Sequence, residues 1–158
     1  MSIQIPNLHT SNRSKVTADG ATVFIKRRQD GSHSGQFTVN GSLSFNPAAD
    51  AYPSGSMVIK VDLNDSVTGT IAVKTVEPLD TTGRATPTAY ATGRCDFKAD
   101  PPPAGCRYWI MLADNKRANE EKTDDIISFL VYDRTGKRVA YGSGPVVKGD
   151  LFVAPTSE

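Results

Sequence analysis

The stretch QFTVNGSLSF, residues 36–45, decides the fold class of this chain of 158 residues. Large apolar side chains alternate along it with short polar ones. The apolar set is Phe37, Val39, Leu43 and Phe45. Because successive side chains of a strand point to opposite faces of a sheet, the alternation predicts a strand with one buried face and one wet face.

Similar short runs occur on both sides of this stretch, separated by turn-forming Gly, Pro, Asn and Asp residues. They are ATVFIKRR (21–28), MVIKVDL (57–63), SVTGTIAVKTV (66–76), YATGRCDF (90–97), CRYWIML (106–112), IISFLVYD (126–133), RVAYG (138–142) and DLFVAP (150–155). We expect turns at Asp19-Gly20 and Asn64-Asp65, and a long loop at residues 77–88. About eight to ten short strands without helical periodicity predict an antiparallel β-sandwich of jelly-roll or immunoglobulin-like type, with a closed β-barrel as the alternative.

The length predicts a single domain over residues 15–154, preceded by a polar arm (1–14) and followed by a short tail (155–158). Such an arm either frays or adds a strand to the sheet of a neighbouring subunit. Arm exchange of this kind would make the chain a homo-oligomer. The apolar side chains that the arm would contribute are Ile3, Ile5 and Leu8.

Opposite charges nearly balance, with 18 Lys and Arg against 17 Asp and Glu. A chain without a strong net field is not expected to bind nucleic acid or an anionic membrane. The opening MSIQIPNLHT lacks a basic segment followed by an apolar one, and no run approaches the roughly 18 apolar residues of a membrane span. We therefore expect a soluble chain that does not insert into membranes, and that is made without a leader or has lost it.

Both cysteines flank the stiff segment DPPPAG, with Cys95 before it and Cys106 after it. With only two histidines, His9 and His33, they do not make up a standard tetrahedral zinc site. Alternation on the flanking strands brings both sulfurs to the mouth of one hairpin, which predicts a disulfide; two reduced thiols are the alternative. A disulfide favours an oxidising compartment, and hence an extracellular location or a cell or virion surface.

The segment DNKRANEEKTDD, residues 114–125, concentrates acidic side chains within one expected loop. Calcium takes about six to eight oxygen ligands, and loops at strand ends supply them in many β-sandwiches. The spacing is not that of an EF-hand, and basic residues are interspersed, so a solvated loop of mixed charge is the alternative. No other cofactor is predicted. The calcium candidates are Asp114, Glu120, Glu121, Asp124 and Asp125.

Aromatic side chains on the wet face of a sheet can stack on sugar rings. If Tyr108 faces the interior, strict alternation turns Trp109 outward. An outward Trp109 marks a binding or assembly surface, unless the domain or a second subunit covers it. The candidates for glycan or small-ligand binding are Trp109, Tyr108, Tyr90 and Tyr132.

No catalytic constellation stands out in the sequence. Both histidines lie in expected loops, where neither is held beside a nucleophile. The nucleophile-elbow, P-loop, zinc-protease and dinucleotide-binding motifs do not occur. Two catalytic carboxylates can converge from distant loops without forming a sequence motif, but no feature of the sequence indicates such a pair. We therefore expect a protein that is not an enzyme.

The C-terminal half carries three runs in succession: GRCDF, GCRYWIMLADN and TDDIISFLVYDRTGKRVAYGSG. An alternating strand ends in an Asp, a loop follows, and an Asp-led strand then runs into an Asp-x-x-Gly turn and a strand that carries Tyr. The anchors are Asp114, Asp124, Asp133, Gly136 and Tyr141. Over residues 91–144 this pattern resembles small antiparallel β domains of uncharacterised bacterial secreted and surface proteins. The resemblance implies an accessory or structural module.

Together these features predict a non-enzymatic structural or adhesive protein that acts by self-assembly or surface attachment, as a decoration, filament or surface module. Its partner would be a second copy or another protein. The alternative is a glycan- or small-ligand-binding module, with calcium at residues 114–125.

Overall fold

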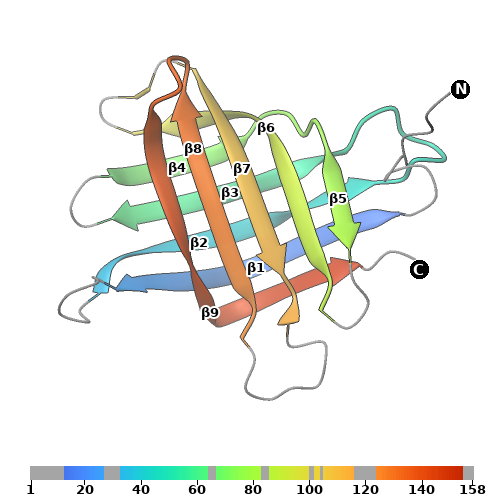
Figure 1. The fold of residues 1–158 in the computed structure, drawn as a ribbon, viewed down its shortest axis with the longest axis horizontal. Helices are drawn as coiled ribbons and strands as arrows, with labels where there is room; N and C mark the ends of the chain where they lie inside the picture. Colours follow the sequence, from blue (N-terminus) through green and yellow to red (C-terminus); the bar gives the residue numbers. More distant parts are fainter. Residues whose placement is uncertain are drawn as a thin grey trace, which may run out of the picture.

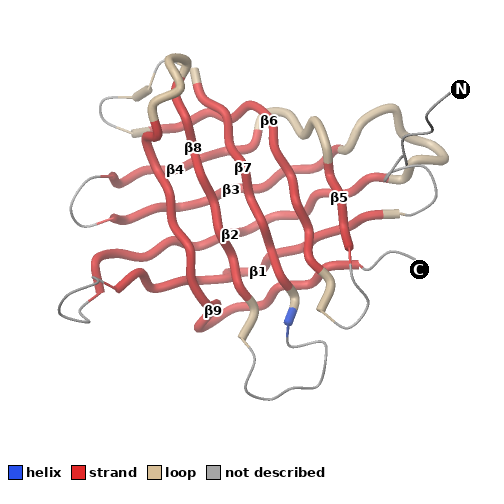
Figure 2. The backbone as a smooth tube through the Cα atoms, viewed as in Figure 1, coloured by secondary structure: helices blue, strands red, loops and turns tan. Residues whose placement is uncertain are grey.

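The computed structural model describes residues 13–26, 33–63, 67–82, 86–99, 102–103, 105–115 and 124–154. Nine strands make up most of these residues, and all neighbouring strands run antiparallel, which confirms the expected all-β class (Figure 1). Asn115 is the only helical residue in these ranges, so none of them forms a helix long and apolar enough to span a membrane (Figure 2). The strands are β1 (Ser14–Lys26), β2 (His33–Phe45), β3 (Ser54–Leu63), β4 (Val67–Val73), β5 (Leu79–Thr82), β6 (Thr88–Lys98), β7 (Cys106–Ala113), β8 (Ile126–Asp133) and β9 (Arg138–Ala154).

Eight of the strands close into a barrel, and β5 lies beside β6 as an additional strand. Sequential neighbours pair from β1 to β4 and from β6 to β9, and β9 pairs back onto β1. The ring closes where residues 70–73 of β4 pair with residues 95–98 of β6. The first half of β6 pairs instead with β5. The expected sandwich is therefore wrong, because this pairing joins the two sheets; the alternative, a closed barrel, is the fold.

The long strand β9 bends and pairs with both layers of the barrel. One layer contains β1 to β4 and the other β6 to β8, and the two cross each other steeply in Figure 1. Strand β9 spans 17 residues, of which the first part pairs with β8 and the part from Val146 onward pairs with β1. Near the bend Gly149 has a φ of 84°, and a Cβ there would lie 2.0 Å from the carbonyl oxygen of Gly20. Gly20 itself lies in a bulge inside β1. The expected Asp19-Gly20 turn is thus a bulge, and the runs RVAYG and DLFVAP are two halves of one strand.

The interior of the barrel is a continuous apolar core. All four apolar side chains of the stretch QFTVNGSLSF are buried in it, as the alternation predicts. Phe37 of β2 contacts Phe129 of β8 edge to face, with ring centroids 4.8 Å apart. Side chains therefore fill the space between the two layers. The largest fully buried ones are Tyr108, Phe37, Phe129, Leu43, Met57, Ile59, Ile71, Leu79, Ile110, Leu112, Ile127 and Val16.

The segment at residues 77–88 is not only a loop, because it contains β5. Leu79 and Thr81 of β5 are buried, and the hydroxyl of Thr81 hydrogen-bonds that of Ser14 at the start of β1, at 3.0 Å. β5 therefore contacts the start of β1 as well as its pairing partner β6. A strand of four residues between Pro78 and Gly83 offers too short an alternation to be predicted from the sequence.

Candidate functional site

The outer face of strands β6 to β9 carries a row of large apolar side chains. The strand register places Trp109 of β7 beside Leu130 of β8, and Leu130 beside Tyr141 of β9. These side chains point outward because their chain neighbours Tyr108 and Phe129 fill the interior. Trp109 and Leu130 are half-buried among their neighbours, and Tyr141 is 56% exposed. An apolar row thus crosses three strands on the water side of the barrel.

Further apolar side chains flank this row on both sides. Tyr90 of β6 lies opposite Met111 of β7, and its ring centroid lies 6.4 Å from that of Trp109. Tyr132 is exposed on β8, two residues beyond Leu130. Large exposed apolar patches mark interaction sites in soluble proteins, which makes this surface a candidate site. We call it the aromatic face, and it consists of Tyr90, Trp109, Met111, Leu130, Tyr132 and Tyr141.

The outer surface of β1 to β4 has a different composition. Hydroxyl side chains form cross-strand pairs on it: Thr22 with Thr38 at 3.0 Å, and Thr17 with Ser42 at 3.2 Å. These pairs satisfy the polar groups of the two strands. Exposed apolar side chains also occur on this side of the barrel, namely Val58 of β3 and Val147 and Phe152 on the half of β9 that pairs with β1. The aromatic face is therefore distinguished by apolar side chains that adjoin across neighbouring strands, and not by exposed apolar residues alone.

Charged residues lie at the two ends of the aromatic face. At one end the guanidinium of Arg138 lies over the ring of Tyr141, 4.2 Å from its centroid, which is a cation–π contact. Arg107 at the same end forms an ion pair with Glu77. At the other end the exposed Asp124 precedes β8. The face is thus apolar at its centre, with Arg138 and Arg107 at one end, here called the basic end, and Asp124 at the other.

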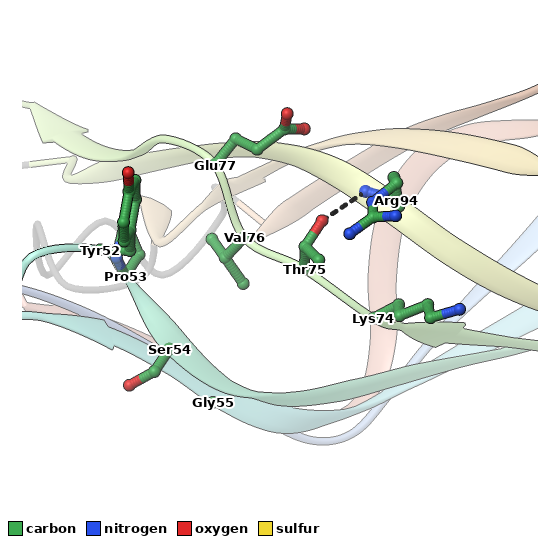
Figure 3. A pocket seen from close by; sticks show the side chains of 9 residues that line it. All are labelled: Tyr52, Pro53, Ser54, Gly55, Lys74, Thr75, Val76, Glu77 and Arg94. Carbon is green, nitrogen blue, oxygen red and sulfur yellow. Dashed lines mark hydrogen bonds between the residues drawn. The ribbon is translucent and has the colours of Figure 1, made fainter.

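A pocket of about 530 Å³ opens next to the basic end of the aromatic face (Figure 3). We call it the β3–β4 pocket; residues 52–55, residues 74–77 and Arg94 line it. The sequence did not predict this pocket, because the predicted strand at residues 66–76 runs past Val73, where β4 ends. Gly93 was the available signal, since a glycine inside a strand marks a close backbone approach. A Cβ at Gly93 would lie 2.0 Å from the carbonyl oxygen of Thr75.

The two cysteines lie directly opposite each other at the end of the β6–β7 pair. Their sulfurs are 2.8 Å apart, and the thiol of Cys106 also donates to the carbonyl oxygen of Cys95 at 2.9 Å. They are free thiols, so the expected disulfide is not formed in this structure, and the alternative of two reduced thiols fits. Burial raises the pKa of the Cys95 thiol, and the hydrogen bond with Cys106 raises it further. A thiol held protonated in this way is a poor nucleophile.

Two of the predicted calcium ligands, Asp114 and Asp125, are buried where the β7–β8 connection leaves the barrel. The carboxylate of Asp114 accepts a hydrogen bond from the N–H of Val153 at 3.1 Å, which ties this point to β9. Asp124 is exposed. Within the described ranges, no three His, Cys, Asp or Glu side chains are grouped so as to hold a metal, and calcium stays a prediction. The remaining candidates, outside the described residues, are Glu120 and Glu121.

The four aromatic candidates separate into two groups. Trp109, Tyr90 and Tyr132 come together on the aromatic face, whereas Tyr108 lies in the interior and is 1% exposed. Sequence reasoning did not single out Leu130, because a lone apolar residue on a strand carries no signal until its cross-strand neighbours are known.

No protein-family model, curated protein or solved structure matches the chain. The resemblance of residues 91–144 to small bacterial β domains therefore stays a prediction. Docking of the arm also stays a prediction, since its residues lie outside the described ranges. They include Ile3, Ile5 and Leu8.

Proposed function

We propose that the protein is a non-enzymatic interaction protein that self-associates through its aromatic face. The observation that carries this proposal is the outward row of Trp109, Leu130 and Tyr141, which continues into Tyr90 and Tyr132. Apolar surface of this extent is unfavourable in water, and contact with a similar surface removes it from water. Complete burial of one such side chain contributes at most about 1.5–3 kcal/mol relative to full exposure, so several together can support association.

A second copy of the chain fits this face by symmetry and by charge. In an isologous dimer the same patch contacts itself. A two-fold axis that crosses the strands near Trp109 stacks one apolar centre on the other. It also brings the basic end of one copy, with Arg138, over the end of the other copy that carries Asp124. The 18 basic and 17 acidic residues leave little net repulsion between two copies.

Light scattering coupled to size exclusion tests this proposal directly. We expect a particle with twice the mass of one chain, which dissociates on dilution. Trp109 is the single tryptophan, so its fluorescence provides a second measurement. The emission is expected to shift to longer wavelength on dilution, because water reaches the indole when the two copies separate.

The variant Tyr141→Glu places a carboxylate within the proposed apolar contact and is expected to shift the population to monomer. Tyr52→Glu is the matched control, because Tyr52 is 74% exposed but lies outside the aromatic face. Both variants are expected to keep the circular dichroism spectrum of the wild type. A monomeric wild type, or a Tyr141→Glu variant that associates as well as Tyr52→Glu, contradicts the proposal.

Association through the aromatic face does not require the arm. Deletion of residues 1–12 is therefore expected to leave the dimer intact. If the deletion dissociates the dimer while Tyr141→Glu does not, self-association belongs to the arm and not to the aromatic face. The extracellular or surface location stays a prediction that this experiment does not address.

A further inference from the structure

The β3–β4 pocket exists because two paired strands separate. β3 and β4 pair from Leu63↔Val67 to Val58↔Ala72. β3 extends back to Ser54, whereas the chain after Val73 leaves β3 and follows β6. Residues 54–57 of β3 therefore have no partner on β4, and the pocket lies between them and residues 74–77 (Figure 3). Its volume of about 530 Å³ lies in the range of small-molecule sites.

Backbone hydrogen bonds hold the wall of the pocket in place. The N–H groups of Lys74 and Thr75 both donate to the carbonyl oxygen of Arg94, at 2.9 and 3.1 Å. The N–H of Arg94 donates in return to the hydroxyl of Thr75 at 2.9 Å, as drawn in Figure 3. The hydroxyl of Tyr108 donates to the carbonyl oxygen of Thr75 from the barrel interior at 2.9 Å. A wall fixed in this way is pre-organised, which lowers the conformational entropy that the protein loses when a ligand binds.

The pocket carries an excess of positive charge. Lys74 and Arg94 lie on the same side of it in Figure 3. Glu77 also lines it, but its carboxylate forms an ion pair with Arg107. Lys74 has one weak, exposed ion pair with Asp96 at 4.0 Å. No hydrogen bond or ion pair joins the guanidinium of Arg94 to another described residue.

The opposite side of the pocket offers a ring and a hydroxyl group. Tyr52 is 74% exposed and lies across the pocket from Arg94 in Figure 3. Pro53 and Val76 are buried beneath it and supply an apolar floor. Ser54 adds a hydroxyl. Tyrosine rings stack on the apolar faces of sugars, while guanidinium and ammonium groups bind carboxylates through charge-assisted hydrogen bonds.

We propose that the β3–β4 pocket binds an acidic sugar, a saccharide that carries a carboxylate. The carboxylate pairs with Arg94 and Lys74, the sugar ring stacks on Tyr52, and a sugar hydroxyl bonds Ser54. A purely apolar ligand would leave the charges desolvated, and a small inorganic anion would leave Tyr52 unused. The inference does not depend on self-association, because the pocket lies outside the aromatic face.

Titration of the ¹⁵N-labelled protein with sodium glucuronate, followed by NMR, tests the inference. The backbone signals of Thr75 and Arg94 are expected to move, and the indole N–H signal of Trp109 is not. Glucose, at matched ionic strength, is expected to bind at least about tenfold more weakly, because it lacks the carboxylate that forms charge-assisted hydrogen bonds.

Variants with matched controls separate the contact with the carboxylate from the stacking of the sugar ring. Arg94→Gln is expected to weaken glucuronate binding about tenfold or more, since it removes the charged partner. Lys98→Gln is its control, because Lys98 is an exposed cation on the same strand outside the pocket. Tyr52→Ala is expected to weaken binding of glucuronate but not of inorganic phosphate.

Four results would overturn the inference. The first is that glucuronate leaves the pocket signals unmoved, and the second is that glucose binds equally well. The third is that phosphate binds as tightly as glucuronate with no effect of Tyr52→Ala on either, which identifies a simple anion site. Movement of the Trp109 indole signal without movement of Thr75 and Arg94 places the sugar on the aromatic face instead.

Discussion

Tyr108 and Thr75 connect the core of the barrel to the wall of the β3–β4 pocket. The ring of Tyr108 is buried, and its hydroxyl donates a hydrogen bond of 2.9 Å to the carbonyl oxygen of Thr75. Thr75 lies in the connection after β4, which also bonds to β6 through the N–H groups of Lys74 and Glu77. One interior hydroxyl therefore helps to fix the backbone that forms the pocket.

The substitution Tyr108→Phe keeps the buried ring and removes this donor. It leaves the carbonyl oxygen of Thr75 without its side-chain partner, so we expect the free energy of unfolding to fall by about 1–3 kcal/mol in urea titrations. Tyr90→Phe is the matched control, because the hydroxyl of Tyr90 lies on the exposed aromatic face; it is expected to change stability by no more than about 0.5 kcal/mol. Equal effects of the two substitutions would show that the bond to Thr75 does not contribute.

Alkaline pH is expected to destabilise the fold through two interior groups. Burial raises the pKa of the Cys95 thiol and of the Tyr108 hydroxyl above their ordinary values of 9.0 and 10.0. The folded protein thus keeps two protons that the unfolded chain releases. The free energy of unfolding is therefore constant with respect to these groups below pH 9.0 and falls as pH rises above it.

Urea unfolding measured at a series of pH values tests this dependence. Cys95→Ala removes one of the two groups, so its free energy of unfolding is expected to fall less steeply than that of the wild type above pH 9.0. An identical slope in the variant would mean that Cys95 releases its proton equally in both states.

The cysteine pair is expected to be unreactive toward alkylating reagents in the native protein, because both thiols are buried and that of Cys95 stays protonated. Oxidation during refolding, when both thiols are accessible, is expected to join them within one chain, since in the folded protein they occupy directly paired positions with sulfurs 2.8 Å apart. Mass spectrometry after denaturation and alkylation distinguishes two free thiols from an intrachain disulfide. The closed loop would raise stability by up to about 3 kcal/mol in the chain-entropy model. Rapid alkylation of the native protein, or oxidation to linked dimers, contradicts this prediction.

Much of the strand content could be predicted because it depends on local alternation. The stretch QFTVNGSLSF buries every apolar side chain that its period of two assigns to the interior. Closure of the barrel could not be predicted in the same way. It depends on pairing between residues 70–73 and 95–98, and on bends at glycines such as Gly149 and Gly20. A glycine in a short sequence run is compatible with a turn, a bulge or a bend, so Asp19-Gly20 was expected to reverse the chain and instead bends a strand.

The candidate sites also divide into features that local alternation predicts and features that depend on pairing between distant strands. The outward position of Trp109 follows from alternation once Tyr108 is inside. The aromatic face needs the register as well, because Leu130 and Tyr141 join Trp109 only when β7, β8 and β9 are neighbours. The β3–β4 pocket depends on the point at which two strands separate, and no local pattern specifies that point.

The bend in β9 gives a final prediction that uses two glycines with similar backbone angles. Gly149 and Gly136 have φ values of 84° and 87°. A Cβ at Gly149 would lie 2.0 Å from the carbonyl oxygen of Gly20, whereas a Cβ at Gly136 would meet nothing within 4 Å. Gly136→Ala therefore carries only the strain of a positive φ, and we expect a loss of about 1 kcal/mol in the free energy of unfolding. Gly149→Ala carries the same strain and also forces β1 and β9 apart, so its loss is expected to exceed that of Gly136→Ala by at least about 1 kcal/mol. Equal losses in urea unfolding would mean that the contact between β1 and β9 can relax without cost, and that the close approach of Gly149 to Gly20 does not hold the barrel closed.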